Sequence, residues 1–392
     1  MTLPDQEVLN AIVARVFHID DVTLGDPQKN FTVRYRGHLI VDSEQAFDQL
    51  VVSLNPNGIT PLLRKDGKGG HLIFLTLKAP QARSSRIYIN VILFILTVFS
   101  VMLAGAQPEG PLPSDPLGQL WALAGSIFTG WPFALSLLTI LLAHEFGHYL
   151  VSRFHKTNAS LPYFLPFPFS PLGTMGAFIQ MKEPVRNKRV LFDIGVAGPF
   201  AGLIVAIPVL FLGLSLSSLG SIERNPGMFI EGNSLMYLLA KFIAFGKLLP
   251  SPINMGGLPL PLYWLKFFFT GQPFPLGGTD VVIHPVAFAG WAGLLVTALN
   301  LIPAGTLDGG HILFSLFGDR TRKFYPFIMV ILVGLGFVWS GWWLWAAMLF
   351  LLGRVYAEPL DQITPLDPTR KVLAVLALVI FVLAFTPVPF IS

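Results

Sequence analysis

The stretch Leu137–Val151 reads LLTILLAHEFGHYLV, and the interpretation of the whole chain starts from it. It is apolar enough to form a membrane-spanning helix, yet it carries His144, Glu145 and His148 near its C-terminal end. Ionisable side chains are costly inside a membrane segment, so their presence there is by default evidence for a functional site.

The spacing of the two histidines indicates a metal site. Residues four apart project from the same helical face about one turn apart, so His144 and His148 can reach a single zinc ion. Glu145, next to the first ligand, can then take a proton from an attacking water. The simpler alternative is that both histidines only pack or hydrogen-bond to neighbours. The full HExxH pattern within an apolar run favours the metal site.

The composition indicates a multi-spanning membrane protein. The chain has 392 residues, of which 53% are hydrophobic and 12% charged, about half the charged fraction of a soluble domain. A net charge of +4 suits the positive-inside bias of membrane proteins better than nucleic-acid binding, so no nucleic-acid partner is expected. Because there are no cysteines, zinc must be held by His, Asp, Glu or water. No cleavable signal peptide is visible at the N-terminus.

Residues 1–82 differ from the rest and predict a small, soluble α+β domain. Three histidines within it, at positions 18, 38 and 71, are expected to be surface or packing residues rather than ligands. The predicted elements are two helices, one strand and a hairpin around the turn KDGKGG: Glu7–Phe17, Phe31–Ile40, Ser43–Leu54, and the pair Ile59–Arg64 and His71–Leu77.

Residues 83–392 predict a polytopic α-helical membrane domain with about six or seven spans. Arg83 and Arg86 precede the first span, and the loop after that span is acidic, which predicts a cytoplasmic N-terminal domain. Basic residues also follow the HExxH helix, so the active site is expected to open on the cytoplasmic side. The predicted spans are Ile87–Ala106, Trp131–Phe154, Val190–Ser215, Pro285–Pro303, Phe324–Trp339, Gly341–Gly353 and Val372–Ile391.

Two features between these spans stand out. Leu161–Pro184 holds several prolines that prevent a regular helix, and within it Gly173–Met181 predicts a short extended segment. Irregular backbone at membrane depth must be buried in protein or line a cavity, so we expect a re-entrant β segment beside the metal. An ordinary cytoplasmic loop is the alternative. Gly198 and Gly202 form a GxxxG pattern, which predicts close helix packing. Residues 217–284 predict an external segment.

A second motif, ALNLIPAGTLDGGHI, covers residues 298–312. Its single carboxylate, Asp308, is the predicted third ligand, leaving one zinc position open. A helix-capping role is the alternative. Asn300 is a candidate donor to a developing oxyanion or to substrate backbone, although a structural amide explains it equally well. His284 and His311 are alternative candidates for ligands or for residues that support them, although structural roles are expected for both.

Together, HEFGH at 144–148 and NLIPAGTLDG at 300–309 resemble the site-2 protease family of intramembrane zinc metalloproteases, whose NxxPxxxLDG pattern the second motif fits. The resemblance covers a core at about residues 131–318. It implies His144, His148 and Asp308 as the ligands of one zinc ion and Glu145 as the catalytic base. It also implies that the Gly173–Met181 region receives substrate as an added strand.

The expected function is therefore regulated intramembrane proteolysis. The chain would hydrolyse peptide bonds in or near the transmembrane segments of membrane-protein substrates, most simply single-span proteins in the lipid bilayer. A regulatory role for the N-terminal domain is a hypothesis. The alternative is a membrane metal transporter or metal-gated sensor that uses the same ligands and gives Glu145 no special task.

Overall fold

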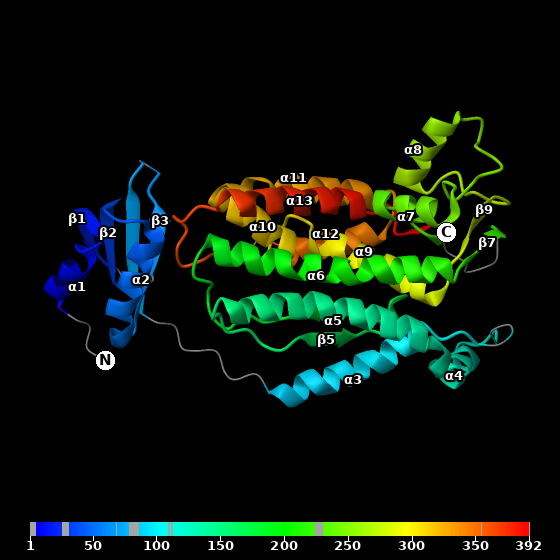
Figure 1. The fold of residues 1–392 in the computed structure, drawn as a ribbon, viewed down its shortest axis with the longest axis horizontal. Coiled ribbons are helices and arrows are strands. Elements are labelled where there is room, and N and C mark those ends of the chain that lie inside the picture. The colour runs from blue at the N-terminus through cyan, green and yellow to red at the C-terminus, as the bar shows by residue number, and fades with distance from the viewer. Residues whose placement is uncertain are drawn as a thin grey trace.

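The computed structural model describes residues 5–25, 31–67, 69–77, 86–108, 110, 113–223, 230–353 and 355–391. Figure 1 shows a small sheet domain at one end and a bundle of helices beside it, with the longest helices running along the long axis of the molecule. Arg83, one of the two arginines expected before the first span, lies outside the described residues.

The N-terminal domain is an antiparallel sheet of order β1-β2-β4-β3 with two helices. Helix α2 starts where Asp42 accepts a hydrogen bond from the Glu44 backbone N–H at 2.9 Å, an N-cap that satisfies a free helical donor. Apolar side chains from the sheet and both helices form the domain's core. The elements are α1 (Gln6–Val13), β1 (Phe17–Leu24), β2 (Val33–Leu39), α2 (Ser43–Leu54), β3 (Ile59–Lys65) and β4 (His71–Leu77).

The C-terminal end of the first predicted helix in this domain was wrong. The helix expected to continue to Phe17 ends at Val13, and Phe17 begins β1 instead. The strand was missed because Asp20 and Asp21 interrupt the alternation of apolar residues, and its pairing with β2 shifts register at this point.

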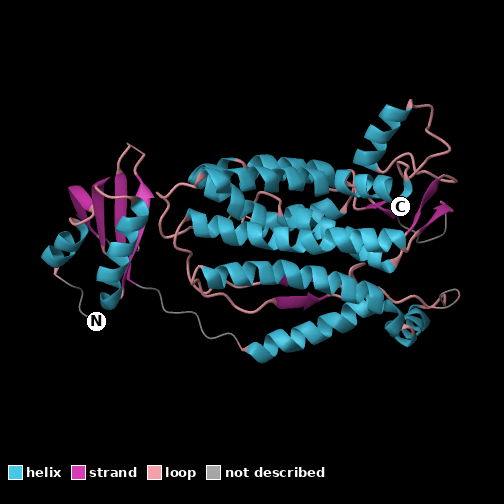
Figure 2. Ribbon diagram, viewed as in Figure 1, coloured by secondary structure: helices cyan, strands magenta, loops and turns pink. Residues whose placement is uncertain are grey.

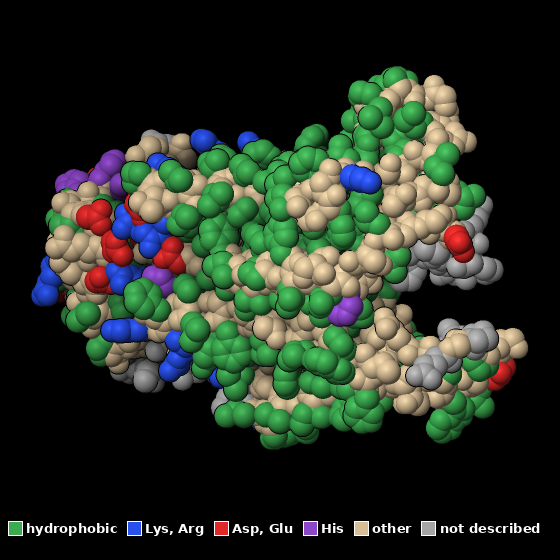
Figure 3. Space-filling model, turned by 45° about the vertical axis from the view of Figure 1, so that its right-hand side comes forward, with side chains coloured by type: hydrophobic (Ala, Val, Ile, Leu, Met, Phe, Trp, Pro, Cys, Tyr) green, Lys and Arg blue, Asp and Glu red, His purple; other side chains and the backbone are tan. Residues whose placement is uncertain are grey.

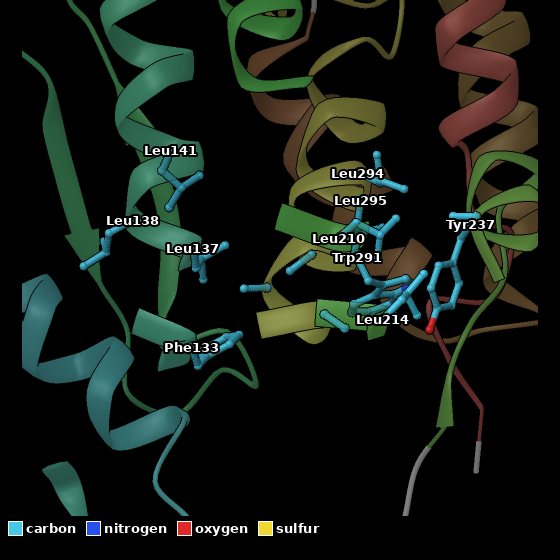
Figure 4. Packing of buried hydrophobic residues seen from close by; sticks show 14 of the residues in the cluster. Phe133, Leu137, Leu138, Leu141, Leu210, Leu214, Tyr237, Trp291, Leu294 and Leu295 are labelled. Atoms are coloured by element: carbon cyan, nitrogen blue, oxygen red, sulfur yellow. The ribbon is translucent and has the colours of Figure 1, made fainter. Parts of the chain in front are cut away.

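The centre of the membrane part is formed by α5 (Trp131–Phe154), α6 (Lys188–Ser215) and α9 (Pro285–Asn300), which pack against one another. Figure 4 shows their apolar side chains meeting in one cluster, with Phe133, Leu137, Leu138 and Leu141 on α5, Leu210 and Leu214 on α6, Trp291, Leu294 and Leu295 on α9, and Tyr237 beside Trp291. This cluster holds α5 and α9 at a fixed separation.

Among the residues that the structure describes, three helices are long and apolar enough to cross a membrane. They are α3 (Ile87–Ala104), Ile127–Phe154, which includes α5, and Lys188–Ser215, which is α6. Figure 3 shows a mainly hydrophobic middle, with charged side chains gathered at the end that carries the N-terminal domain. This distribution is consistent with an integral membrane protein, since apolar surface faces lipid and charge stays at the interfaces.

The later apolar helices are shorter than the predicted spans. α9 ends at Asn300 because the chain turns before Pro303, and α13 ends at Ala384 because Phe385 is extended. The count of six or seven crossings therefore stays a prediction. The remaining helices are α4 (Pro116–Gly125), α7 (Leu235–Phe245), α8 (Leu260–Thr270), α10 (Asp308–Phe317), α11 (Tyr325–Gly336), α12 (Gly341–Leu352) and α13 (Pro368–Ala384).

The proline-rich segment forms a two-stranded antiparallel hairpin of β5 (Tyr163–Pro166) and β6 (Thr174–Phe178). It lies against α3, whose polar side chains satisfy its free carbonyls. Asn90 donates to the Leu161 carbonyl at 2.9 Å, and the Ser100 hydroxyl donates to the Gly173 carbonyl at 2.6 Å. These bonds stabilise irregular backbone beside a membrane-spanning helix.

Residues 217–284 contain α7 and α8 together with β7 (Ser218–Ser221), β8 (Ile230–Glu231) and β9 (Thr279–Val282). β7 pairs with β9, while β8 pairs with β10 (Phe390–Ile391) near the C-terminus. A fully buried ammonium, Lys241, lies 3.3 Å from the Asp280 carboxylate. The two opposite charges compensate each other. Burial, and after it the Asp280 carboxylate, raises the pKa of the neighbouring Glu231 to about 7.

We expect Lys241→Met to destabilise the protein, because it leaves the Asp280 carboxylate buried without its partner. Removing one member of a buried pair typically costs about 3–5 kcal/mol. Thermal unfolding in detergent would measure the loss, with Lys247→Met, which removes an exposed ammonium two residues beyond α7, as the matched control. Equal melting temperatures for the two variants would contradict a structural role for the pair.

Candidate metal centre

Three ligand atoms converge between α5 and the first turn of α10. The Nε2 atoms of His144 and His148 lie 3.2 Å apart, and each lies 3.3 Å from Oδ2 of Asp308. In a tetrahedral zinc site with bonds of 2.0–2.1 Å, ligand atoms are separated by about 3.3 Å. The three atoms therefore fit a zinc site and leave its fourth position for water or substrate.

Helix α6 orients the second histidine. The Nδ1–H of His148 donates to the Ile194 carbonyl at 2.7 Å, which leaves Nε2 free to bind metal. A hydrogen bond to the non-ligating nitrogen fixes the tautomer and ring orientation of a metal-binding histidine. His144, Glu145 and His148 are all buried, so these side chains have little freedom to rotate away.

The GxxxG pattern on α6 does more than bring helices together. A Cβ atom at Gly198 would lie 2.0 Å from Nε2 of His148, and one at Gly202 would lie 3.2 Å from Cβ of His144. The His148 imidazole thus occupies space that a side chain at Gly198 would fill, and His144 packs tightly against Gly202. Sequence reasoning predicted the close packing of this helix but not its relation to the histidines.

The turn after α9 places the third ligand. Gly305 has φ +58°, a conformation that glycine adopts readily, and a Cβ at Gly309 would lie 2.0 Å from the Leu301 carbonyl oxygen. This tight reversal brings Asp308 back toward α5. The N-cap position of α10 is Leu307, so Asp308 is the first helical residue rather than the cap.

Two cavities meet at the metal centre. One, of about 280 Å³, lies among α5, β6, α9 and the C-terminal strand, and has a mainly apolar lining that includes Trp339 and Phe390. The other, of about 270 Å³, includes His148 and Asp308 in its lining. His144, Glu145, Asn300 and Ala177 of β6 line both cavities. A molecule held along β6 would therefore pass the metal centre and Glu145.

The structure also shows which of the other candidate residues lie at the site. Asn300 belongs to the site, since its Nδ2 lies 3.3 Å from Nε2 of His144. His311 lines the second cavity, and its Nδ1 forms no hydrogen bond among the described residues. His284 instead accepts from the Val286 N–H at the start of α9. Because Asn300 ends this 16-residue helix, His284 lies about 24 Å from the site and is not a ligand.

The histidines of the N-terminal domain have local contacts, as expected. His18 and His38 lie 3.6 and 3.5 Å from the Asp20 carboxylate, while His71 accepts from the Leu39 N–H.

Asp193 on α6 pairs with the side chains of His155 and Arg370, with closest contacts of 2.9 and 2.6 Å. Asp193 thus ties α6 to the residue after α5 and to the first turn of α13.

We expect Gly198→Ala to abolish stoichiometric zinc binding, because the added methyl group would occupy the position of the His148 imidazole. Gly202→Ala, whose methyl group makes a tight contact that small shifts relieve, should retain most of the zinc. Metal analysis of the purified variants measures both outcomes. Full zinc content in Gly198→Ala would contradict the steric relation between α6 and His148.

Comparison with known proteins places these observations in a family. A model of "Peptidase family M50" matches residues 132–340, more than half of the chain. The chain is 30% identical to "Probable zinc metalloprotease EGY1, chloroplastic" of Arabidopsis thaliana, over 76% of this chain and 53% of that protein. The rice protein of the same name (Oryza sativa subsp. japonica) is 29% identical over 76% of this chain and 50% of its own length.

"Probable zinc metalloprotease EGY2, chloroplastic" of Arabidopsis thaliana is 30% identical, over 67% of this chain and 42% of that protein. This chain thus spans about half the length, or less, of these curated relatives. No solved structure matches. The matched region contains both motifs of the metal centre, and the chain belongs to peptidase family M50, the site-2 protease family.

Proposed function

We propose that this chain is an intramembrane zinc metalloprotease. The observation that carries the proposal is the convergence of two motifs 156 residues apart on one three-ligand cluster, with Glu145 beside it in a shared cavity. When bound, zinc polarises the scissile carbonyl and activates water for attack on it. The proposed ligands are His144, His148 and Asp308.

The chain's own groups account for the remaining steps. Glu145 accepts a proton from the attacking water and passes it to the leaving amine. Its burial beside the cluster keeps bulk water away, which strengthens its interactions with reacting groups. Asn300, which lines both cavities, donates hydrogen bonds to the developing oxyanion or to substrate backbone.

Strand β6 is the proposed substrate platform. A transmembrane substrate helix has its backbone amides satisfied internally, so it must unwind before cleavage, and strand pairing can satisfy the freed groups. Thr174, Met175, Gly176 and Ala177 of β6 line the apolar cavity, and a Cβ at Gly176 would meet no atom within 4 Å. This open edge supports an extended substrate segment lying beside Glu145.

The proposed substrates are single-span membrane proteins. An apolar cavity lining suits the side chains of a transmembrane segment. The Lys and Arg side chains visible in Figure 3 lie mainly at the end with the N-terminal domain, which supports a cytoplasmic position for that domain and for the opening of the active site.

Glu145→Gln tests the chemistry directly. We expect this variant to keep one zinc per chain and to lose turnover by at least about 10²-fold, because it removes the proton acceptor but no proposed ligand. Asp308→Ala should lose both zinc and turnover. The assay is cleavage of a panel of reconstituted single-span proteins, with products identified by mass spectrometry and Glu7→Gln, on α1, as control.

The transporter alternative gives a different result. A transporter would carry zinc across liposomes, and Glu145→Gln would leave that flux intact. Zinc flux by the wild type without any cleavage of the panel would overturn the protease proposal.

A further inference from the structure

Backbone hydrogen bonds along one edge of the N-terminal sheet connect it to the membrane part. β3 is its edge strand, and residues 360–362 add beside it. The Leu63 N–H donates to the Leu360 carbonyl at 2.9 Å, and the Gln362 N–H donates to the Leu63 carbonyl at 3.0 Å. An exposed sheet edge offers such unpaired groups, and here the loop between α12 and α13 uses them.

The same loop pairs on its other side with the chain that enters α6. The Leu360 N–H donates to the Val185 carbonyl at 2.9 Å, and the Asp361 N–H donates to the Arg186 carbonyl at 2.8 Å. Residues 360–362 therefore link the N-terminal sheet to residues 185–187 through isolated backbone bridges on both sides of Asp361. Figure 1 shows this end of the bundle facing the sheet domain.

Ion pairs strengthen this contact. Arg186 lies 2.7 Å from the Asp48 carboxylate, and Arg189 lies 2.8 Å from the Glu44 carboxylate. Both acidic residues belong to α2, whereas both arginines lie at the start of α6 or just before it. Several charges of opposite sign across one surface set the orientation of two partners.

The interface also has a buried centre. The hydroxyls of Ser43 and Thr364 hydrogen-bond at 2.8 Å, and Ile363 joins the apolar core of the N-terminal domain. Asp361 is completely buried and accepts from the backbone N–H groups of Ile363 and Thr364. The Ser43–Thr364 bond crosses between the two parts, so a shifted arrangement would leave the buried Ser43 hydroxyl without this partner.

The residues that contact the N-terminal domain are connected in sequence to the elements of the metal centre. Residues 179–187 connect β6 to α6, and Asn187 caps α6 by accepting from the Val190 N–H at 3.0 Å. One turn later, the Ile194 carbonyl orients His148. Among the described residues, the linings of both cavities contain none from the N-terminal domain, so docking does not block the site.

We propose that the docked N-terminal domain stabilises the metal centre. The backbone pairing of residues 360–362 with β3 and the two ion pairs hold α6 and β6 in the geometry that the metal centre needs. Release of the domain loosens the site. The inference goes beyond the proposed protease function, and only its turnover measurement rests on that function.

The test begins with charge reversal in the full chain. Glu44→Arg with Asp48→Arg should release the domain by like-charge repulsion, and adding Arg186→Glu and Arg189→Glu should restore docking. Hydrogen exchange at the Leu63 amide reports docking, while continued protection of the β2–β4 ladder shows that the domain is folded. Glu7→Arg, exposed on α1 at the far end of the domain, is the control.

The released variant should lose zinc to a chelator at least about tenfold faster than the control. Its kcat should fall by a similar factor at unchanged KM, because small misplacement of catalytic groups is costly. A second variant locks the domain. Ser43→Cys with Thr364→Cys introduces the only cysteines of the chain at side chains already in contact. Oxidation of this pair in the charge-reversed chain should restore both rates, and reduction should remove the effect.

Each arm can overturn the proposal. Unchanged exchange at Leu63 in the charge-reversed chain would show that the ion pairs do not hold the domain. If the domain is released but the rate of zinc loss is unchanged, or kcat rises, docking does not stabilise the metal centre and the proposal is refuted. If no substrate is cleaved even by the wild type, the protease proposal fails, while amide exchange and zinc release still decide this inference.

Discussion

Three candidate ligand atoms lie within 3.3 Å of one another, and this close approach is the central constraint on the fold. Their residues come from α5 and α10, and the main chain of α6 orients one of them. Such short separations leave no room for side chains between the backbones. The glycines on α6 and in the turn before α10 follow from this requirement, since bulkier residues there would displace the imidazoles or the turn.

The surrounding structure can be understood as support for that cluster. The apolar contacts among α5, α6 and α9 fix three helices. Two of them carry His144, His148 and Asn300, and α6 orients His148. Polar side chains of α3 hydrogen-bond to backbone carbonyls of the hairpin segment. These bonds hold the edge of β6 beside the buried Glu145. In the proposed function, the helix contacts hold the candidate metal ligands, and the hairpin contacts hold the strand that would pair with an extended substrate.

Much of the site could be predicted from the sequence because it is encoded in short, specific motifs. The i, i+4 spacing on an apolar helix predicted that His144 and His148 lie together, and Asp308 was the single carboxylate of the second motif. The prolines excluded a regular helix, and the extended segment predicted at Gly173–Met181 contains β6 at Thr174–Phe178. The position of β1 was hidden by its aspartates, and span lengths were overestimated where helices end at turns inside apolar sequence.

Two features depend on contacts that local sequence does not encode. The steric fit between Gly198 and His148 joins helices whose relative rotation comes from tertiary packing. The pairing of Leu63 with Asp361 joins residues almost 300 positions apart, through a loop that has no strand pattern. In both cases, only the assembled structure shows which surfaces meet.

X-ray absorption at the zinc edge on the purified protein tests the central claim most directly. The account predicts a first shell of nitrogen and oxygen at about 2.0–2.1 Å with the outer-shell scattering of two imidazoles. It also predicts that Asp308→Asn alters this shell while both imidazole contributions remain in any zinc still bound. A zinc environment with fewer than two imidazoles in the wild type would contradict the cluster on which the account rests.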